Sequence, residues 1–374
     1  MRLTSIRAKN FKSFKDLDIR LDNLNVLIGA NASGKSNFVQ LFTFIRDILM
    51  SGLENAISIQ GGAKYLRNIN CGEGDQISIG LSIEHDLVAS LVRSEYRLSL
   101  AFSGGRQVAI IEDELRSESR DGAVSTIRRV GNQYQTEGDP GPLQGFLPAM
   151  QTEDVRHPRL LIEYLPWFIG LRSIGTYDID SKAPKNGVFG LPSELEPEAD
   201  NLAIVLDRIL SDDEDRRKLM NFLKDALPFA EGLDIEALSD RSLLFKMQER
   251  FSNQAMPAAF LSDGTIDMIA LIVILYFERK PLVIIEEAER NLHPSLMSRL
   301  VEYFEDASRR KQILITTHSP EIVRFMDPGH LILITRDTAG FSHAERPVDR
   351  EQVQRFLRDE LTMHDLYVEN LLEV

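Results

Sequence analysis

The sequence has 374 residues, a formal net charge of −14 and a single cysteine, and 43% of its residues are hydrophobic. It is too long for one simple core, so we expect two lobes or domains. One cysteine excludes an intrachain disulfide and a cysteine-rich zinc site, and the acidic charge argues against a protein that coats DNA. With no secretory signal and no apolar run of membrane-spanning length, we expect a cytoplasmic protein without a membrane segment.

Alternating apolar residues predict two strands between residue 1 and about residue 30, joined by a polar turn at Lys12-Ser13. The apolar run 25–28 then ends at a glycine, as a buried strand does. The next eight residues, 29–36, read Gly-Ala-Asn-Ala-Ser-Gly-Lys-Ser and fit the phosphate-binding pattern G-x-x-x-x-G-K-[ST]. An amphipathic helix is expected from residue 36 onward, which completes the strand, glycine-rich turn and helix that this motif requires.

The chemistry of this loop follows from its residues. Glycines let the backbone bend so that successive N–H groups point at one phosphate, and the helix N-terminus adds partial positive charge. Lys35 can reach the β- and γ-phosphates of a nucleotide, and the Ser36 hydroxyl can ligate Mg²⁺. The alternative is a glycine-rich turn that binds nothing, which the full motif in this context disfavours.

The middle of the chain changes from strands to helices. Period-two apolar patterns over residues 76–130 predict an antiparallel sheet of several strands. The apolar run 160–167 predicts a helix-like segment, and helical spacing predicts two more helices over residues 201–210 and 216–227, the second capped within the acidic run 211–215. No sustained heptad pattern is present, so no long coiled-coil arm is expected.

The last third of the chain is again α/β. The apolar run 282–285 predicts a central strand covered on both faces, and it ends directly at Glu286 and Glu287. Open α/β sheets place ligand chemistry at such strand ends, and in phosphate-loop NTPases one carboxylate there holds Mg²⁺ while a neighbour orients water. The alternative is a pair of solvated glutamates at a strand end.

Two further segments could complete a nucleotide site. His318 follows the apolar run 313–315 and could hydrogen-bond a γ-phosphate or the attacking water, or could instead be tied to local backbone before the next helix. Ser262-Asp263-Gly264 precedes an apolar helix over residues 266–277 and offers N–H groups and a hydroxyl to an anion. Taken alone, Ser262 is an ordinary N-cap.

Together and in this order, these motifs resemble the head of ABC-type ATPases, and most closely the branch of SMC, RecF and OLD-like proteins that are often described as AAA family ATPases. The resemblance rests on a signature-like segment at 261–265, a Walker B segment at 282–287, the switch histidine His318, an N-terminal motif at 10–14 with Asn37, and a segment at 286–294 similar to EEPExxLHP. It implies an α/β fold with a mixed central sheet that carries the phosphate loop, an antiparallel β subdomain and a helical insertion. The corresponding ranges are 1–140 and 256–374 for the two parts of the ATPase head and 141–255 for the helical insertion or lid.

The resemblance also implies roles for individual residues, with ATP and Mg²⁺ as cofactors. The resemblance implies contacts with ATP for Lys12, Ser13, Gly29, Ala30, Asn31, Ala32, Ser33, Gly34, Lys35, Ser36 and Asn37. It also implies contacts in trans, from a second chain, for Ser262, Asp263 and Gly264. Ser36 and Glu286 would hold Mg²⁺, and the catalytic residues would be Glu287, which polarises the attacking water, His318, which senses the γ-phosphate, and Lys35.

This sequence departs from the family pattern at several positions. Glu286 stands where aspartate is usual, and its extra methylene could shift the Mg²⁺ contact to a water molecule. Ala288 replaces a proline. Arg290 and His293 fall in the D-loop, which lies near the partner's site in dimers of this family. Gln60 is a weak candidate for the Q-loop glutamine.

The resemblance implies ATP hydrolysis in a head-to-head homodimer or a higher oligomer. The first hypothesis is a switch that controls a separately encoded effector, as related stand-alone ATPases do in bacterial anti-phage defence. The second is a DNA repair or recombination ATPase of the RecF type that binds duplex DNA, and the third is a phosphate-loop module that rarely hydrolyses. The acidic charge favours the first over the second, and Glu287 and His318 argue against the third. Neither SMC-type arms nor the nuclease domain of OLD proteins is expected.

Overall fold

The structure is a computed structural model that describes residues 1–68, 70–72, 75–85, 91–103, 107–131, 133–139, 144, 159–165, 168–190, 194–240, 242–358, 362–369 and 371–372. As expected from its length, the chain forms two compact units. The first comprises Met1–Ile174, Gly329–Arg355 and Leu372–Val374, and the second comprises Gly175–Pro328 and Phe356–Leu371. These units have boundaries of their own, and the three ranges expected from the sequence stay a prediction.

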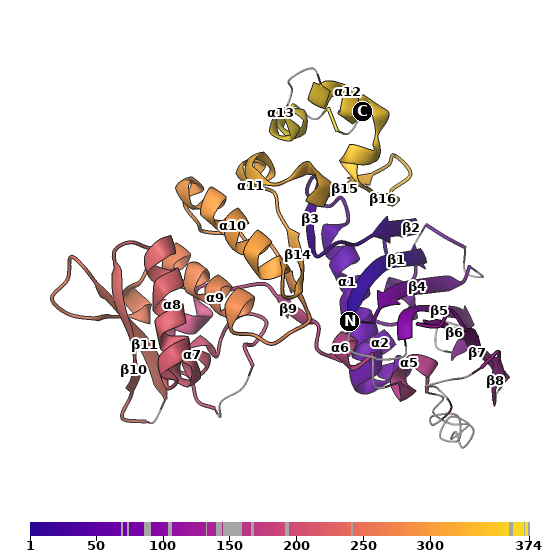
Figure 1. Ribbon diagram of the computed structural model, residues 1–374, viewed down its shortest axis with the longest axis horizontal. Coiled ribbons are helices and arrows are strands. Elements are labelled where there is room, and N and C mark those ends of the chain that lie inside the picture. Colours follow the sequence, from indigo (N-terminus) through magenta and orange to yellow (C-terminus); the bar gives the residue numbers. More distant parts are fainter. Residues whose placement is uncertain are drawn as a thin grey trace. The chain divides into compact units, whose positions relative to one another are not determined.

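The first unit is built on a sheet whose strands run in the order β8-β7-β6-β5-β4-β1-β2-β16-β15-β3 (Figure 1). Its strands are β1 (Arg2–Phe11), β2 (Phe14–Arg20), β3 (Leu24–Ile28), β4 (Ile77–Glu84), β5 (Leu91–Ser103), β6 (Gln107–Ser119), β7 (Val124–Val130), β8 (Gln133–Glu137), β15 (Leu331–Arg336) and β16 (Ser342–Glu345). The run from β8 to β2 is antiparallel throughout, whereas β3 pairs with β15 in parallel. The mixed sheet and the antiparallel subdomain predicted from the sequence are therefore confirmed.

Helix α1 (Lys35–Ser51) packs on this sheet through phenylalanines spaced along one face. The ring of Phe38 meets that of Phe14 edge-on at 6.2 Å between centroids, and Phe44 lies 6.0 Å from Phe11. All four rings are fully buried, and each stabilises the fold by roughly 1.5–3 kcal/mol relative to an exposed ring. This packing fixes the helix that begins at the phosphate loop against β1 and β2.

Shorter helices complete the first unit: α2 (Leu53–Ile59), α3 (Ala63–Leu66), α5 (Leu161–Tyr164), α6 (Ile169–Arg172), the single turn η7 (Pro347–Asp349) and α12 (Glu351–Arg358), which begins in this unit. The apolar run 160–167 is not one helix-like segment. It forms the single turn α5, after which Leu165 is extended, and residues 166–167 lie outside the described part. Leu160, Leu161 and Ile162 are buried side by side, so the continuous apolar pattern reflects burial on all sides rather than a helix face.

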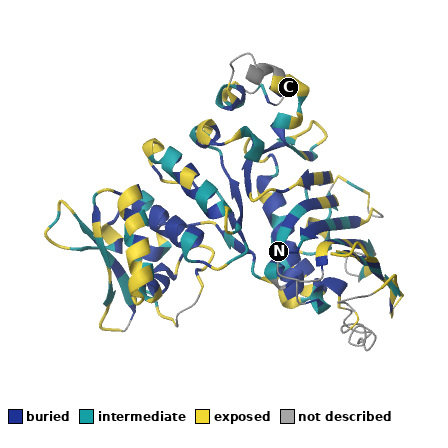
Figure 2. Cartoon of the chain, in the orientation of Figure 1, coloured by how far each residue is buried: buried dark blue, intermediate teal, exposed yellow. Residues whose placement is uncertain are grey.

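The second unit contains three parallel strands, with β13 (Leu282–Ile285) between β9 (Gly175–Tyr177) and β14 (Gln312–Thr316). Every residue of β13 and β14 is buried, as the continuous apolar runs predict. The unit also contains α9 (Asp263–Tyr276), α10 (Met297–Ser308), α11 (Pro320–Phe325), α13 (Met363–Val368) and the single turns η3 (Ala183–Lys185), η4 (Ala258–Phe260) and η5 (Pro294–Leu296). Helix α9 is buried over most of its length (Figure 2).

Two predicted helices of the second unit are confirmed as α7 (Leu202–Leu210) and α8 (Asp213–Ala226), and Asp212 caps α8. A three-stranded antiparallel sheet beside these helices was not predicted from the sequence. It is formed by β10 (Ala230–Ala237), β11 (Leu243–Glu249) and β12 (Met256–Pro257) (Figure 1). Ala230 is the one buried residue of β10, although Leu233 and Ile235 alternate with Asp234 and Glu236 as strand residues do. Among the described residues, none of the helices combines the length and the apolar character that a membrane crossing requires.

Candidate functional site

Residues 29–36 form the predicted turn between β3 and α1, and its two motif glycines are required by their surroundings. Gly29 has φ 146° and Gly34 has φ 121°, a region that favours glycine. A Cβ atom on Gly29 would lie 2.1 Å from the carbonyl oxygen of Ile334, and one on Gly34 would lie 2.3 Å from the Oγ of Ser342. The loop is therefore pressed against β15 and β16 in a shape that other residues could not adopt.

The ammonium group of Lys35 lies inside this loop. Its Nζ donates to the carbonyl oxygens of Gly29 at 2.8 Å and Ala30 at 2.9 Å, and the residue is 7% exposed. Ser36, in the first turn of α1, is exposed. Gly34, which has no side chain, occupies the N-cap position, so the helix N-terminus presents backbone N–H groups and a lysine charge to an anion.

One atom of the loop supports a bound anion directly. The Oγ of Ser33 is buried, the residue is 3% exposed, and this hydroxyl has no hydrogen-bond partner among the described residues. A buried polar group without a partner costs roughly 1–3 kcal/mol, so such groups call for a ligand or water. A phosphate oxygen in the loop would satisfy it. The residues present therefore fit a nucleotide phosphate.

Ser13 and Asn37, whose contacts with ATP stay predictions, hydrogen-bond to each other beside the loop, and Ser342 joins them. The Oγ of Ser13 accepts a hydrogen bond from Asn37 Nδ2 at 2.8 Å, which ties the turn between β1 and β2 to α1. Ser342 Oγ lies 2.8 Å from Ser13 Oγ and 2.5 Å from the Ser33 carbonyl oxygen. Ser342 is fully buried on β16. A lone serine so far along the chain carries no sequence signal, and only the fold brings it to the loop.

Other candidates near this loop have weaker support. Lys12 lies in the turn after β1 with φ 48°, and its backbone N–H donates to the carbonyl of Leu66 at 2.9 Å. Burial lowers the pKa of the Lys12 ammonium. Gln60 follows α2, and its amide donates to Thr43 Oγ1 at 3.4 Å. Their contacts with ATP stay predictions.

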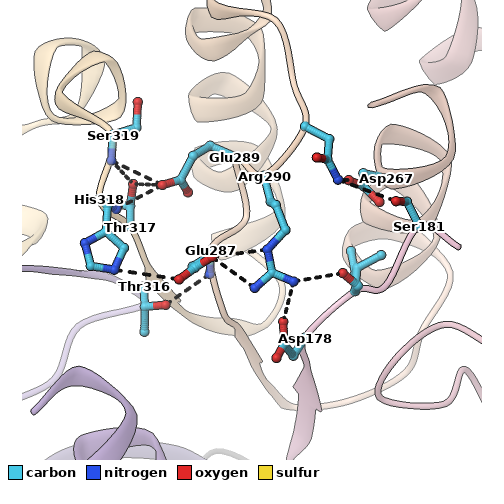
Figure 3. Close-up of polar contacts among 12 residues, drawn as sticks. Asp178, Ser181, Asp267, Glu287, Glu289, Arg290, Thr316, Thr317, His318 and Ser319 are labelled. Carbon is cyan, nitrogen blue, oxygen red and sulfur yellow. Dashed lines mark hydrogen bonds and ion pairs between the residues drawn. The ribbon is translucent and has the colours of Figure 1, made fainter. Parts of the chain in front are cut away.

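A second group of polar residues surrounds the end of β13 in the second unit (Figure 3). Glu286 donates its backbone N–H to the carbonyl of Tyr177 at 2.8 Å, and Glu287 donates its own to Thr316 Oγ1 at 3.1 Å. Glu287 has φ 46°, a conformation that costs a non-glycine residue roughly 1–3 kcal/mol. The chain thus turns sharply at the predicted catalytic carboxylate.

The carboxylate of Glu287 meets a cation on one side and an imidazole on the other. Its Oε2 accepts from Arg290 Nε at 3.1 Å and Nη2 at 3.0 Å, while its Oε1 lies 3.7 Å from Nε2 of His318. The same guanidinium pairs with Asp178 at 2.9 Å. The structure therefore brings the predicted Glu287 and His318 together, and it adds Arg290 and Asp178, which the sequence did not assign to this carboxylate.

The signature-like segment and the D-loop form one packed block. Ser262 caps α9, because its Oγ accepts from the Thr265 N–H at 3.2 Å. The N-cap interpretation is therefore confirmed, and the contact of Ser262 with a partner's ATP stays a prediction. A Cβ on Gly264 would lie 2.4 Å from the carbonyl oxygen of Asn291. Asn291 donates to Asp267 Oδ2 at 2.9 Å, and Asp263 pairs with Lys185 at 2.6 Å, which lowers the pKa of Asp263.

Asp267 gives this block a pH dependence. Burial raises the pKa of its carboxyl group to about 6, although the Asn291 hydrogen bond opposes the shift, and Oδ1 is buried without a partner among the described residues. Because the folded state holds the proton more tightly than the unfolded state does, the stabilisation is complete below about pH 4 and is lost as the pH rises through about 6. The loss amounts to at most about 3 kcal/mol.

We therefore expect Asp267→Asn to flatten the pH dependence of unfolding. Denaturant titrations of wild type and Asp267→Asn between about pH 4 and pH 7 measure this. The unfolding free energy of wild type should fall relative to that of the variant as the pH rises. Parallel curves across this window would show that Asp267 titrates as an ordinary carboxylate.

Comparisons with known proteins identify the family and the fold of this chain. The sequence family described as "AAA domain, putative AbiEii toxin, Type IV TA system" matches residues 24–324. An ATP/GTP phosphatase of Helicobacter pylori is 19% identical, with 87% of each chain covered. Endonuclease GajA of Bacillus cereus is 22% identical over 89% of this chain, which spans 58% of GajA's length.

A solved SMC head bound to the C-winged helix domain of ScpA superposes with a TM-score of 0.53 at 14% identity, covering 92% of this chain and 97% of that one. This likeness shows the fold, an ABC-type ATPase head. The family match covers most of the chain, including the phosphate loop, the signature-like segment and the end of β13. The chain belongs to this AAA family and is an ATPase with an SMC-like head.

Proposed function

We propose that this ATPase is a switch that dimerises head-to-head around ATP and Mg²⁺ and controls a separately encoded effector protein, in bacterial antiviral defence. The observation that carries the proposal is the block formed by Ser262, Gly264 and Asn291, which seats the signature-like segment against the D-loop. In the ATPases that this chain resembles, both segments face a partner subunit. ATP binding would then be read out as dimer formation.

The phosphate loop supplies binding. Lys35 would exchange its contacts with the Gly29 and Ala30 carbonyls for phosphate oxygens, and Ser33 would use its unpartnered hydroxyl. Ser36 and Glu286 would hold Mg²⁺, which when bound neutralises charge at the phosphates. Within the described ranges, His, Cys, Asp and Glu side chains nowhere gather in threes to hold a metal ion. This suits Mg²⁺, which takes one or two protein ligands together with phosphate oxygens.

The residues around β13 would carry the chemical step. Glu287 would accept a hydrogen bond from the attacking water and orient it, since a carboxylate is a suitable base and acceptor there. His318, 3.7 Å from Glu287, would hold the γ-phosphate. In its present position Glu287 accepts two hydrogen bonds from Arg290 through Oε2, which leaves lone pairs on Oε1 to accept from a water molecule.

Mixing two defective variants tests the shared site. Ser262→Arg places a large cation where the signature would meet the partner's ATP, whereas Lys35→Ala disables the phosphate loop. Each variant alone should be nearly inactive. Mixed in equal amounts they form heterodimers with one intact composite site, so about a quarter of wild-type phosphate release should return if the two sites act independently. Ser211→Arg, the same change at an exposed serine of the same unit, is the control.

Two results would contradict the shared site. One is full activity of Ser262→Arg alone, which would remove the signature from the reaction. The other is an absence of recovered activity in mixtures in which heterodimers are shown to form, which would mean that the site is not composite or that both sites must work together. Direct binding of duplex DNA in a gel shift, strengthened by ATP, would instead favour the RecF-type function over control of an effector. The net charge of −14 favours control of an effector protein over direct binding of DNA.

A further inference from the structure

Glu289 makes an unusual set of contacts two residues beyond Glu287. A single carboxylate oxygen, Oε1, accepts from Thr317 Oγ1 at 2.7 Å, from the backbone N–H of His318 at 2.9 Å and from that of Ser319 at 3.2 Å (Figure 3). All three donors belong to the turn between β14 and α11 that carries the switch histidine. One side chain of the D-loop therefore holds the backbone of this turn.

The surroundings make this anchor stiff. Thr317 is fully buried, and its Oγ1 also accepts from the Ser319 N–H at 2.9 Å. The preceding Thr316 accepts from the backbone N–H of Glu287 at 3.1 Å. The end of β13 and the end of β14 are thus joined twice, once through Thr316 and once through Glu289. Charge-assisted bonds of this kind are roughly twice as strong as neutral ones.

We propose that Glu289 is a positioning residue for ATP hydrolysis, which sets the place of His318 relative to Glu287 by holding the backbone of residues 317–319. This inference rests on the roles given above to Glu287 and His318. Glu289 does not touch the reacting atoms in this account. It acts through His318, whose Nε2 lies 3.7 Å from Glu287 Oε1, and a displacement of about 1 Å in such a pair can cost roughly 100-fold in rate.

The environment of the second carboxylate oxygen of Glu289, Oε2, determines which variants test the anchor. This oxygen is buried and has no hydrogen-bond partner among the described residues. Glutamine at this position keeps an amide oxygen for the three donors and places an NH₂ group where Oε2 now lies. Glu289→Gln should therefore preserve the anchor, whereas Glu289→Ala removes it. Glu302→Ala, which changes an exposed glutamate on α10, is the matched control.

The first readout is kinetic. Glu289→Ala should lower kcat by roughly 10- to 100-fold while the calorimetric Kd for ATP changes by less than about threefold. Glu289→Gln should stay within about threefold of wild type in both. In a double-mutant cycle, adding Glu289→Ala to His318→Ala should cost less than about twofold, because a residue that acts through His318 has nothing left to position.

The second readout does not depend on turnover. Amide hydrogen exchange of a peptide spanning residues 314–321 should be at least about tenfold faster in Glu289→Ala than in wild type, and unchanged in Glu289→Gln, because the anchored N–H groups are released. A purely structural role would instead lower the Tm and the ATP affinity together with kcat, and its effect would multiply with that of His318→Ala.

Three results would overturn the inference: unchanged exchange in Glu289→Ala, full multiplication of the two effects in the cycle, or a glutamine variant as impaired as the alanine variant. Faster exchange together with a fully active His318→Ala would also overturn it, but through the role proposed for His318. The two failures are thereby distinguished, since exchange tests the anchor itself and His318→Ala tests the proposed function.

Discussion

Replacing Lys35 by alanine should abolish ATP hydrolysis and weaken binding of ATP–Mg²⁺ by roughly 100-fold, which is the loss of about two charge-assisted hydrogen bonds. The ammonium group is already held inside the phosphate loop by the carbonyl oxygens of Gly29 and Ala30. A nucleotide therefore meets a positive charge that lies in the loop and that would exchange these carbonyls for phosphate oxygens. Alanine leaves those carbonyls without their donor and the phosphates without their cation.

The fold should survive this change. The loop stays pressed against β15 and β16 by Gly29 and Gly34, and removing the donor from two neutral carbonyl acceptors costs about 1–2 kcal/mol. Lys35→Arg should not restore function, because a planar guanidinium is larger than the ammonium group that fits between the two carbonyls. Isothermal calorimetry with ATP–Mg²⁺ measures the binding, and Lys9→Ala, at an exposed position of β1, is the control. ATP affinity unchanged by Lys35→Ala would remove this loop from nucleotide binding.

Site residues that lie within or directly beside a recognisable sequence motif could be predicted from the sequence. The phosphate loop could be recognised because its glycines, Lys35 and Ser36 lie within eight consecutive residues. Strands β13 and β14 could be recognised because strands buried over their full length appear as continuous apolar runs. Position at a strand end then predicted Glu287 and His318, and the structure places them 3.7 Å apart. In each case the chemistry is encoded by neighbouring residues in the chain.

What the sequence did not predict depends on contacts between distant segments. Ser342 supports the phosphate loop from a strand that begins more than 300 residues later, and Glu289 holds a turn that follows a different strand. A single serine has no pattern that marks such a partner, and the segment 286–294 contains Glu289 without indicating which turn it holds. Strands β10 and β11 do alternate, through Leu233 and Ile235 in one and Phe245 and Met247 in the other, but few of their side chains are buried and these short patterns were not predicted as strands.

Glu287→Gln should reduce the rate of ATP hydrolysis by roughly 100- to 10,000-fold while leaving ATP binding nearly unchanged, the range expected for loss of a general base. Glutamine has the same shape, so its amide oxygen can still accept from Arg290, and the turn at φ 46° is kept. What it loses is the negative charge that orients and activates a water molecule. Bound ATP should then persist, and the ATP-dependent dimer should accumulate.

Single-turnover hydrolysis and light scattering in the presence of ATP–Mg²⁺ measure the two parts of this prediction, with Glu302→Gln on the exposed face of α10 as the control. Glu286→Gln provides the sharper comparison. Glu286 follows β13 directly and is proposed to hold Mg²⁺, so its variant should weaken the Mg²⁺ dependence of ATP binding rather than trap a dimer. If Glu286→Gln traps the dimer and Glu287→Gln hydrolyses normally, the two roles are reversed. In that case Glu286 would be the carboxylate that activates water. Arg290 would then bind Glu287 as a residue that takes no part in the chemical step.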